Sequence, residues 1–354
     1  MSVVRIVFFL FLALLGGCGT LDYYSHSILG HLSLMAERES IDSLLENDEI
    51  DPRLRNQLQL AKEIKAYAVS SLSLPNNDSY TEFVSLRKPY VAWNVIATPE
   101  FSTQPLQWCY PIVGCVVYRS YFTPERADTD ARKLKKKGYD VMVGGVRAYS
   151  TLGWFDDPVL SSMLDNSDTY LASLIFHELA HQVIFVPDDV VFNESFAVAL
   201  EREGVRRWLT ENGQTELALN YQQTQSQQDT FVKLMLNARK ELDQVYGLDI
   251  GDQERRQRKA IIIDQLRQRY REEQASFGLQ HDAWFGSELN NAHFAMLATY
   301  YEHVDEFSLL LRSSSDWHGI FEQVSELSEL PSRERKEAIA TLAQDTMVKS
   351  ISSP

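Results

Sequence analysis

The sequence predicts an α+β fold that is mostly α-helical, with a small β-sheet before a central helix and a helical C-terminal region. Apolar residues recur at helical spacing before residue 75 and again after residue 210. Short stretches rich in Val, Ile and aromatic residues, which favour strands, lie between residues 90 and 149. The segment 170–182 is an apolar, helix-compatible run that carries two His residues and a Glu.

The first 17 residues read as a targeting segment, with Arg5 followed by the apolar run Ile6–Leu15. That run is short for a transmembrane helix. Leu15-Gly16-Gly17-Cys18 resembles a lipobox, in which a signal peptidase cuts before a lipidated Cys. Gly19 in place of Asp resembles outer-membrane sorting in Gram-negative bacteria. We therefore expect a lipoprotein held on the outer membrane through lipid at Cys18 and facing the periplasm. An uncleaved anchor and an ordinary secretory signal are the alternatives.

Three further regions follow the targeting segment. Residues 18–75 are expected to form an N-terminal helical segment, and Pro75-Asn-Asn-Asp a turn. Residues 76–210 are expected to hold the catalytic region. Its predicted elements are strands at 90–97, 115–122 and 139–149, the last split at Gly144-Gly145, and a helix at 128–137. Residues 211–354 form a helical C-terminal region that completes the active-site cleft, with long helices expected at 230–246, 252–277 and 290–311.

The central helix contains the string Phe176-His-Glu-Leu-Ala-His-Gln. His177 and His181 are four residues apart, so they lie on one face of a helix and can both bind one metal ion. Glu178 can then take a proton from water at the open side of that metal, as in the H-E-x-x-H zinc peptidases. The second string, Asn193-Glu-Ser-Phe-Ala, begins another helix that can bring back Glu194 as third ligand. One Zn²⁺ per chain is expected. The alternative is a buried helix whose two His make ordinary hydrogen bonds.

These two strings resemble the gluzincin metallopeptidases, above all the zinc aminopeptidases, in which the Glu of the second string is the third zinc ligand. That resemblance implies Glu194 as a ligand and a zincin-like catalytic region. A wider resemblance, to a bacterial family of predicted aminopeptidases that are lipoproteins, covers most of the chain. The strings that carry it are Tyr90-Val-Ala-Trp-Asn-Val, Trp108-Cys-Tyr-Pro-Ile-Val-Gly-Cys, Tyr118-Arg-Ser-Tyr-Phe, Ala148-Tyr-Ser-Thr-Leu-Gly-Trp-Phe-Asp-Asp-Pro and Asn290-Asn-Ala.

Residues that contact substrate are expected next to the helix that carries His177 and His181. In zincins an edge strand beside that helix binds the substrate backbone by strand addition. The segment 146–154 is the candidate, with Tyr149, Ser150 and Gly153 as substrate-binding residues; a core-forming segment is the alternative. A second electrophile, a Tyr or His that donates to the developing oxyanion, is expected from the late helix 290–311. Tyr300 is the candidate there, although a Tyr in a helix can equally be a core residue.

Two secondary predictions concern the cysteines and Glu201. With Cys18 lipidated, Cys109 and Cys115 remain and are expected to form a disulfide in an oxidising envelope compartment; two free thiols are the alternative. Glu201 lies two turns after Glu194 on the same helix face. It can orient a ligand His or pair with an Arg of its own helix, and the Arg pairing is the one expected.

Composition limits the function classes. The 354 residues carry a formal net charge of −15, which argues against a nucleic-acid partner. The basic run 132–137 is the one exception and reads as a solvated helix face, with contact to anionic lipid as the alternative. The sequence therefore predicts a zinc-dependent peptide hydrolase, an aminopeptidase with peptide substrates. A zinc endopeptidase and a non-catalytic envelope assembly or scaffold lipoprotein are the alternatives.

Overall fold

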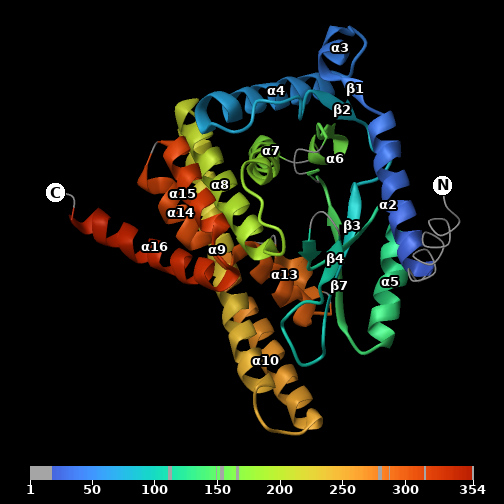
Figure 1. Ribbon diagram of the computed structural model, residues 1–354, viewed down its shortest axis with the longest axis vertical. Coiled ribbons are helices and arrows are strands. Elements are labelled where there is room, and N and C mark those ends of the chain that lie inside the picture. Colours follow the sequence, from blue (N-terminus) through green and yellow to red (C-terminus); the bar gives the residue numbers. More distant parts are fainter. Residues whose placement is uncertain are drawn as a thin grey trace, which may run out of the picture.

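The computed structural model describes residues 18–110, 114–148, 150–151, 155–164, 167–277, 281–286, 288–314 and 316–352. Helices dominate and the sheets are small, which confirms the predicted α+β class (Figure 1). The helices are α2 (Cys18–Ala36), α3 (Ile41–Glu46), α4 (Pro52–Leu72), α5 (Pro124–Lys136), α6 (Ser161–Leu164), α7 (Asp168–Val183), α8 (Val190–Glu211), α9 (Thr215–Tyr246), α10 (Asp252–Glu272), α11 (Gln274–Phe277), α12 (Asp282–Gly286), α13 (Asn291–Tyr301), α14 (Val304–Ser313), α15 (Trp317–Glu329) and α16 (Ser332–Ser352).

The described strands form three small sheets. Their order is β1–β2–β8 in the first, β6–β3–β7 in the second, and β4–β5 in a two-stranded hairpin. The strands are β1 (Glu39–Ser40), β2 (Glu82–Val84), β3 (Ala92–Thr98), β4 (Trp108–Tyr110), β5 (Gly114–Val116), β6 (Arg119–Tyr121), β7 (Asp140–Val146) and β8 (Val159–Leu160). The predicted strand at 115–122 is thus two strands, because β5 pairs with β4 while β6 pairs with β3.

The second sheet is antiparallel and lies beside the helical body. Its central strand β3 pairs along its whole length with β7, so Asn94 lies opposite Gly144. The predicted break at Gly144-Gly145 is wrong, since β7 runs through both glycines. Gly145 is needed for a different reason: a Cβ there would lie 2.5 Å from the ring of Tyr90. Helix α5 covers one face of this sheet, where Val95, Ala97, Tyr121, Ala127, Ala131 and Val141 form a separate apolar cluster.

Helices α7 and α8 form the centre of the molecule, and α4 crosses above them (Figure 1). The three helices meet at Gly204 of α8, where a Cβ would lie 2.8 Å from the ring of Phe176 and 3.0 Å from Leu72. A glycine at this position lets the backbones approach closely. The neighbouring Phe176, which precedes His177, is fully buried and so fixes the position of His177 relative to the core.

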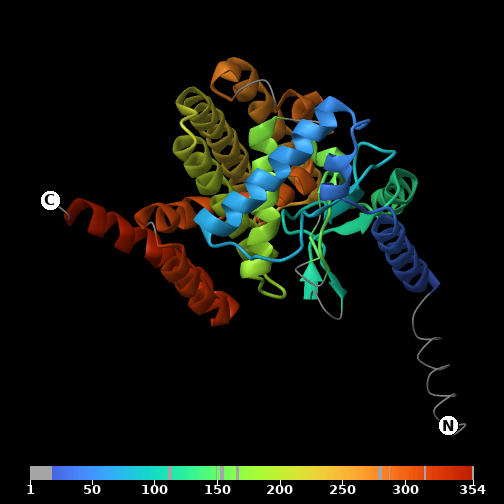
Figure 2. The same cartoon turned by 90° about the horizontal axis from the view of Figure 1, so that it is seen from above.

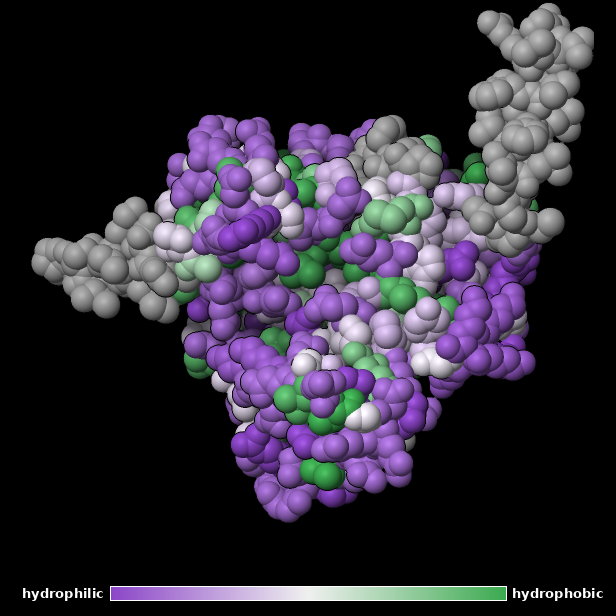
Figure 3. Space-filling view, turned by 60° about the horizontal axis from the view of Figure 1, so that its bottom comes forward, coloured by the Kyte–Doolittle hydropathy of each residue, from purple (hydrophilic) through white to green (hydrophobic). Residues whose placement is uncertain are grey.

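Helices α9 and α10 extend from this body as a long hairpin with its own apolar cluster, which includes Phe231, Leu242 and Ile263 (Figure 1). Hydrophilic residues cover most of the face that includes this hairpin, with small hydrophobic patches between them (Figure 3). Helix α9 starts at Thr215, earlier than the predicted residue 230. The helix predicted over 290–311 is divided into α13 and α14 by a turn at residues 302–303.

The first and last described helices, α2 and α16, lie on opposite sides of the molecule in both ribbon views (Figures 1 and 2). Helix α2 lies on the side of the second sheet, and α16 packs against α14. Within the described residues, none of the helices combines the length and the apolar character that crossing a bilayer requires.

Candidate metal and active site

Helix α7 positions the first two predicted ligands. Ser167 caps its N-terminus, because its hydroxyl accepts a hydrogen bond from the backbone N–H of Tyr170. One turn apart on the buried face, His177 and His181 present their Nε2 atoms 3.3 Å from each other. Both side chains are buried, with relative exposures of 9% and 8%. The local sequence therefore places two imidazole nitrogens at a single point, as the spacing predicts.

Helix α8 brings Glu194 to the same point. Its Oε2 lies 3.2 Å from Nε2 of His177 and 3.8 Å from Nε2 of His181. Tetrahedral zinc with ligand bonds of about 2.0–2.1 Å needs donor atoms roughly 3.3 Å apart. The three donor atoms therefore fit one small tetrahedral cation, and the two His and one Glu form a cluster that could hold a metal ion. Helix α8 begins at Val190 rather than near Asn193, so Glu194 lies in its second turn.

Glu201 lies two turns after Glu194 in α8. It contacts His177 on the side of the ring away from Nε2. Its Oε2 lies 2.8 Å from Nδ1 of His177. The expected pairing of Glu201 with an Arg of its own helix is wrong. Arg202 binds Asp229 of α9, whereas the two later arginines of α8 bind Glu203. The alternative, a carboxylate that orients a ligand His, describes the contact that the structure shows.

Burial and charge together shift the pKa values in this cluster. Burial lowers the pKa of His181 to about 4, with neighbouring His177 adding to the effect and Glu194 opposing it. For His177 burial acts in the same direction, but hydrogen bonds with Glu194 and Glu201 outweigh it and raise the pKa well above its usual value. The pKa of Glu194 is lowered, because the two His outweigh its burial. The cluster thus attracts positive charge, which either a proton or a metal cation can supply.

Glu178 lies in the same pocket but outside the ligand triad. It is 8% exposed, and burial, reinforced by the charge of Glu194, raises its pKa to about 8. A carboxyl group whose pKa is raised toward the working pH can both accept and return a proton. Its sequence position, directly after the first ligand, is the one that the motif predicts for the general base.

The cluster lies at the base of a cavity of about 480 Å³. Aromatic and small side chains from α2, the strands and the α7–α8 loop form its walls. The described lining residues are Tyr23, Tyr24, Ser27, His31, Ala92, Asn94, Tyr110, Val116, Tyr118, Ser120, Phe122, Val146, Ala148, Ser150, His177, Glu178, His181, Phe185, Glu194 and Tyr300. Glu178 and Glu194 supply the carboxylates, and none of the other described lining residues is acidic.

Two tyrosines lie near the ligands. The ring of Tyr300 is 6.5 Å from that of His177, and both Tyr300 and Tyr118 line the cavity. The charge of Glu194, followed by burial, raises the pKa of Tyr300 well above its usual value. Burial, followed by Glu194 and Glu178, raises the pKa of Tyr118 as well. Both hydroxyls therefore stay protonated and can donate. The sequence alone did not identify Tyr118 as a site residue, although Tyr118 begins one of the strings that carry the family resemblance.

Of the predicted substrate-binding residues, Ser150 lines the cavity, whereas Tyr149 and Gly153 lie outside the described residues. Strand β7, at the edge of its sheet, ends at Val146, and the described residues of the segment 147–151 lie in no strand. Buried Asp157 holds this stretch, since its carboxylate accepts hydrogen bonds from the Ser150 hydroxyl and the Thr151 backbone. The chain after β7 therefore follows the cavity wall, to which it contributes Ala148 and Ser150.

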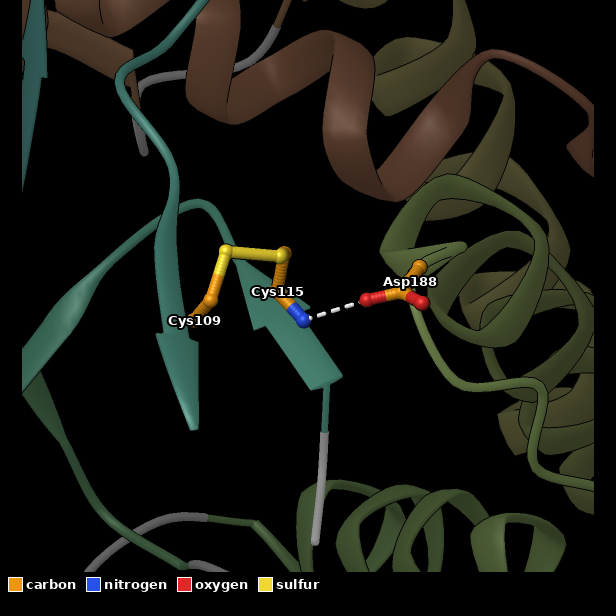
Figure 4. The surroundings of a disulfide bond; sticks show 3 residues. All are labelled: Cys109, Cys115 and Asp188. Atoms are coloured by element: carbon orange, nitrogen blue, oxygen red, sulfur yellow. Dashed lines mark hydrogen bonds between the residues drawn. A yellow bond between two sulfur atoms is a disulfide. The ribbon is translucent and has the colours of Figure 1, made fainter. Parts of the chain in front are cut away.

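Two contacts hold the loop between α7, which carries His181, and α8, which carries Glu194. Cys109 and Cys115 form the predicted disulfide across the β4–β5 hairpin, and the backbone N–H of Cys115 donates to the carboxylate of Asp188 at 2.6 Å (Figure 4). The next residue, Asp189, caps α8 through the N–H of Phe192 and forms an ion pair with buried Arg335 of α16. Both contacts fix the start of the helix that carries Glu194.

Other histidines lie away from the cluster. His293 forms a capping box with Asn290 at the start of α13 and lines a different pocket, beside α5. His303 is the residue before α14. His281 is 5% exposed and stacks on Phe231 with ring centroids 3.8 Å apart.

Comparison with known proteins agrees with the wider resemblance. Residues 22–339 match the model of a protein family described as "Putative aminopeptidase". No curated protein and no solved structure matches the chain. The matched segment covers most of the 354 residues and includes the metal-binding cluster, Glu178 and both tyrosines. The chain therefore belongs to the family described as "Putative aminopeptidase".

Proposed function

We propose that this protein is a zinc-dependent peptidase with His177, His181 and Glu194 as the metal ligands. The observation that carries the proposal is the convergence of three buried donor atoms 3.2–3.8 Å apart, with Glu178 beside them in a cavity. Two imidazoles and one carboxylate suit Zn²⁺, and three protein ligands leave one position open. When bound, zinc lowers the pKa of a water molecule and polarises a peptide carbonyl.

The remaining chemistry belongs to side chains of the cavity. Glu178 accepts the proton of the attacking water and later delivers it to the leaving amine. Tyr300 and Tyr118 are the two candidates that donate a hydrogen bond to the developing oxyanion, since both hydroxyls remain protonated in this pocket. The edge strand β7 and the chain after it, which lines the cavity at Ser150, supply main-chain groups that can hold an extended peptide.

The test combines metal content with hydrolysis for the purified full-length chain. Elemental analysis should find about one zinc per chain, lost in His177→Ala, His181→Ala and Glu194→Ala. Glu178→Gln should keep zinc and lose hydrolysis by roughly 100- to 10,000-fold, since it removes the base and leaves the ligands. Glu216→Gln, an exposed acid in α9, is the control and should behave as wild type. Zinc with no peptide hydrolysis in the wild type would favour the scaffold alternative.

Aminopeptidase and endopeptidase activities differ in what holds the substrate. The family description favours an aminopeptidase. The described cavity wall, however, offers an α-ammonium group no carboxylate besides Glu178 and Glu194, and its tyrosines are the remaining acceptors. Paired peptides with free and acetylated N-termini decide between the two, because an aminopeptidase cleaves the first and spares the second. Equal cleavage of both would assign an endopeptidase.

We further propose that the chain is attached to the outer membrane by lipid at Cys18, facing the periplasm. The support is the lipobox-like string before Cys18, together with Gly19 after it. Metabolic labelling with a fatty acid should mark the wild type and not Cys18→Ser, because the thiol is the acylated group. Label retained by the serine variant would refute the assignment.

A further inference from the structure

Helix α2 has two faces of different character. Its inner face lines the peptide cavity with Tyr23, Tyr24, Ser27 and His31. Its outer face carries Ile28, Leu29 and Leu32, whose relative exposures are 58%, 66% and 56%. The spacing of one and four residues places these three side chains on one side of the helix. None of them lines the cavity.

These three residues are three of the eight exposed large apolar side chains of the described chain, and they lie within five residues of one helix. We name Ile28, Leu29 and Leu32 the α2 patch. A further exposed apolar side chain, Phe155, contacts the other face of α2, where its ring lies 4.9 Å from that of His31. A contiguous exposed apolar surface marks an interaction site, whereas single apolar residues do not.

The place of the α2 patch along the chain identifies its partner. Helix α2 begins at Cys18, directly after the apolar run Ile6–Leu15. Lipid on Cys18 would attach the first residue of this helix to a membrane. The apolar run, if it were not cleaved, would attach the same residue. Leu29 lies 11 residues further on, about 17 Å along the axis. A bilayer at Cys18 reaches it when α2 lies along the surface with its apolar face inserted, as interfacial helices do.

The charged side chains near the α2 patch also fit a membrane as its partner. Asp22, two helical turns before Leu29 on the same side of α2, binds Arg126 of α5 at 2.6 Å. Further along α5, Arg132, Lys133 and Lys136 are exposed. The last turns of α5 are therefore basic, although its first turns carry the exposed acids Glu125 and Asp128 and the whole sequence has a formal net charge of −15. Basic side chains at a membrane surface interact favourably with lipid phosphates.

We propose that the α2 patch, flanked by the basic last turns of α5, lies on a phospholipid bilayer. Helix α2 then separates the bilayer from the peptide cavity: its outer face contacts lipid while its inner face contacts substrate. This inference rests on the proposed membrane attachment at the start of α2 and is independent of the hydrolytic reaction.

The test measures which side of the membrane-bound protein meets lipid. The full chain is labelled with a small fluorophore at Leu29→Cys or at the control site Leu219→Cys of α9, which are 66% and 62% exposed in the parent. The parent chain without the added cysteine supplies the baseline, because its Cys109 and Cys115 are joined. The vesicles contain phosphatidylethanolamine and phosphatidylglycerol, with a nitroxide quencher in the upper acyl chain. Flotation first shows that the chain is bound.

The label at position 29 should be quenched several-fold more strongly than the label at 219. Chain that floats with vesicles but shows equal quenching at the two sites would overturn the docking while leaving the anchor in place. Chain that does not float would overturn both. A dimer in light scattering that Leu29→Glu dissociates, without quenching at position 29, would assign the patch to a second copy instead. Hydrolysis of a soluble peptide by Ile28→Ser/Leu29→Ser/Leu32→Ser should equal wild type, which shows that the fold and cavity are intact.

Discussion

The carboxylate of Glu201 lies 2.8 Å from Nδ1 of His177, on the opposite side of the ring from the metal-binding nitrogen. The contact fixes the tautomer: Nδ1–H donates to Glu201, which leaves the lone pair of Nε2 directed at Glu194 and His181. A carboxylate in this position also raises the basicity of the ligand nitrogen. The second ligand differs, because Nδ1 of His181 has no hydrogen-bond partner among the described residues.

Glu201→Ala should weaken zinc binding by about 10- to 100-fold while leaving the three ligands in place. The cause is the loss of the hydrogen bond that orients His177. Competition with a metal-buffering chelator measures the affinity, with Glu216→Ala as the exposed control. Equal affinity in Glu201→Ala and wild type would show that helix packing alone orients the ring.

The two cavity tyrosines should differ in their effect on the reaction. The one that donates to the oxyanion should lose about 100- to 1000-fold in kcat when changed to Phe, with little change in KM. We expect this for Tyr300, whose ring stacks beside His177, and a smaller loss for Tyr118→Phe. Zinc content checks that each site is intact. The reverse order of effects would transfer the role to Tyr118.

Gly114 and Gly138 both have a positive φ, but only Gly114 has a close neighbour. Alanine variants of the two therefore distinguish the cost of backbone strain from the cost of a steric contact. Gly114 has φ +74° and Gly138 has φ +85°, so Ala at either costs about 1 kcal/mol of unfolding free energy. Around Gly138 a Cβ meets nothing within 4 Å, whereas at Gly114 it would lie 2.5 Å from the Asp188 carboxylate. Urea unfolding should therefore show a larger loss for Gly114→Ala than for Gly138→Ala. Equal losses would mean that the hairpin moves away from the α7–α8 loop without cost.

Acid should destabilise the protein through His281. Burial lowers the pKa of His281 to about 4, with Asp282 opposing the shift. The unfolded chain binds this proton near pH 6.5 and the folded chain only near 4, so stability falls as pH decreases across that interval. Above 6.5 neither state is protonated and the effect vanishes. His281→Phe should show a smaller loss in urea midpoint between pH 7.5 and 5 than wild type. His318→Phe, whose parent side chain is 85% exposed, should retain the wild-type loss.

The sequence predicts those features of the structure that depend only on residues close together in the chain. The helical spacing of His177 and His181 needs no tertiary information, and it is confirmed. The division of the late helix could not be predicted in this way. No breaker occurs around residues 302–303, but the backbone N–H of His303 donates to the hydroxyl of buried Ser195 in α8. A contact between distant segments thus accompanies the turn.

The same distinction holds within the site. Glu201 has three arginines within six residues on its own helix, which favours a local ion pair from sequence alone. The crossing of α7 and α8 at Gly204 decides otherwise, because it brings Glu201 against His177 and leaves the arginines facing Asp229 and Glu203. Tyr118 joins the cavity for a comparable reason, since the β4–β5 hairpin and β6 fold over it from a distant part of the chain.

The ion pair between Asp189 and Arg335 sets an order of assembly. Asp189 caps the helix that carries Glu194, and its partner lies near the C-terminal end of the described chain, in α16. During synthesis α2 emerges early, and Arg335 emerges after nearly all of the described chain. Glu194 therefore acquires its full support only when the chain is almost complete. A peptidase activity that depends on Glu194, as proposed above, would then appear only after nearly the whole chain has been made.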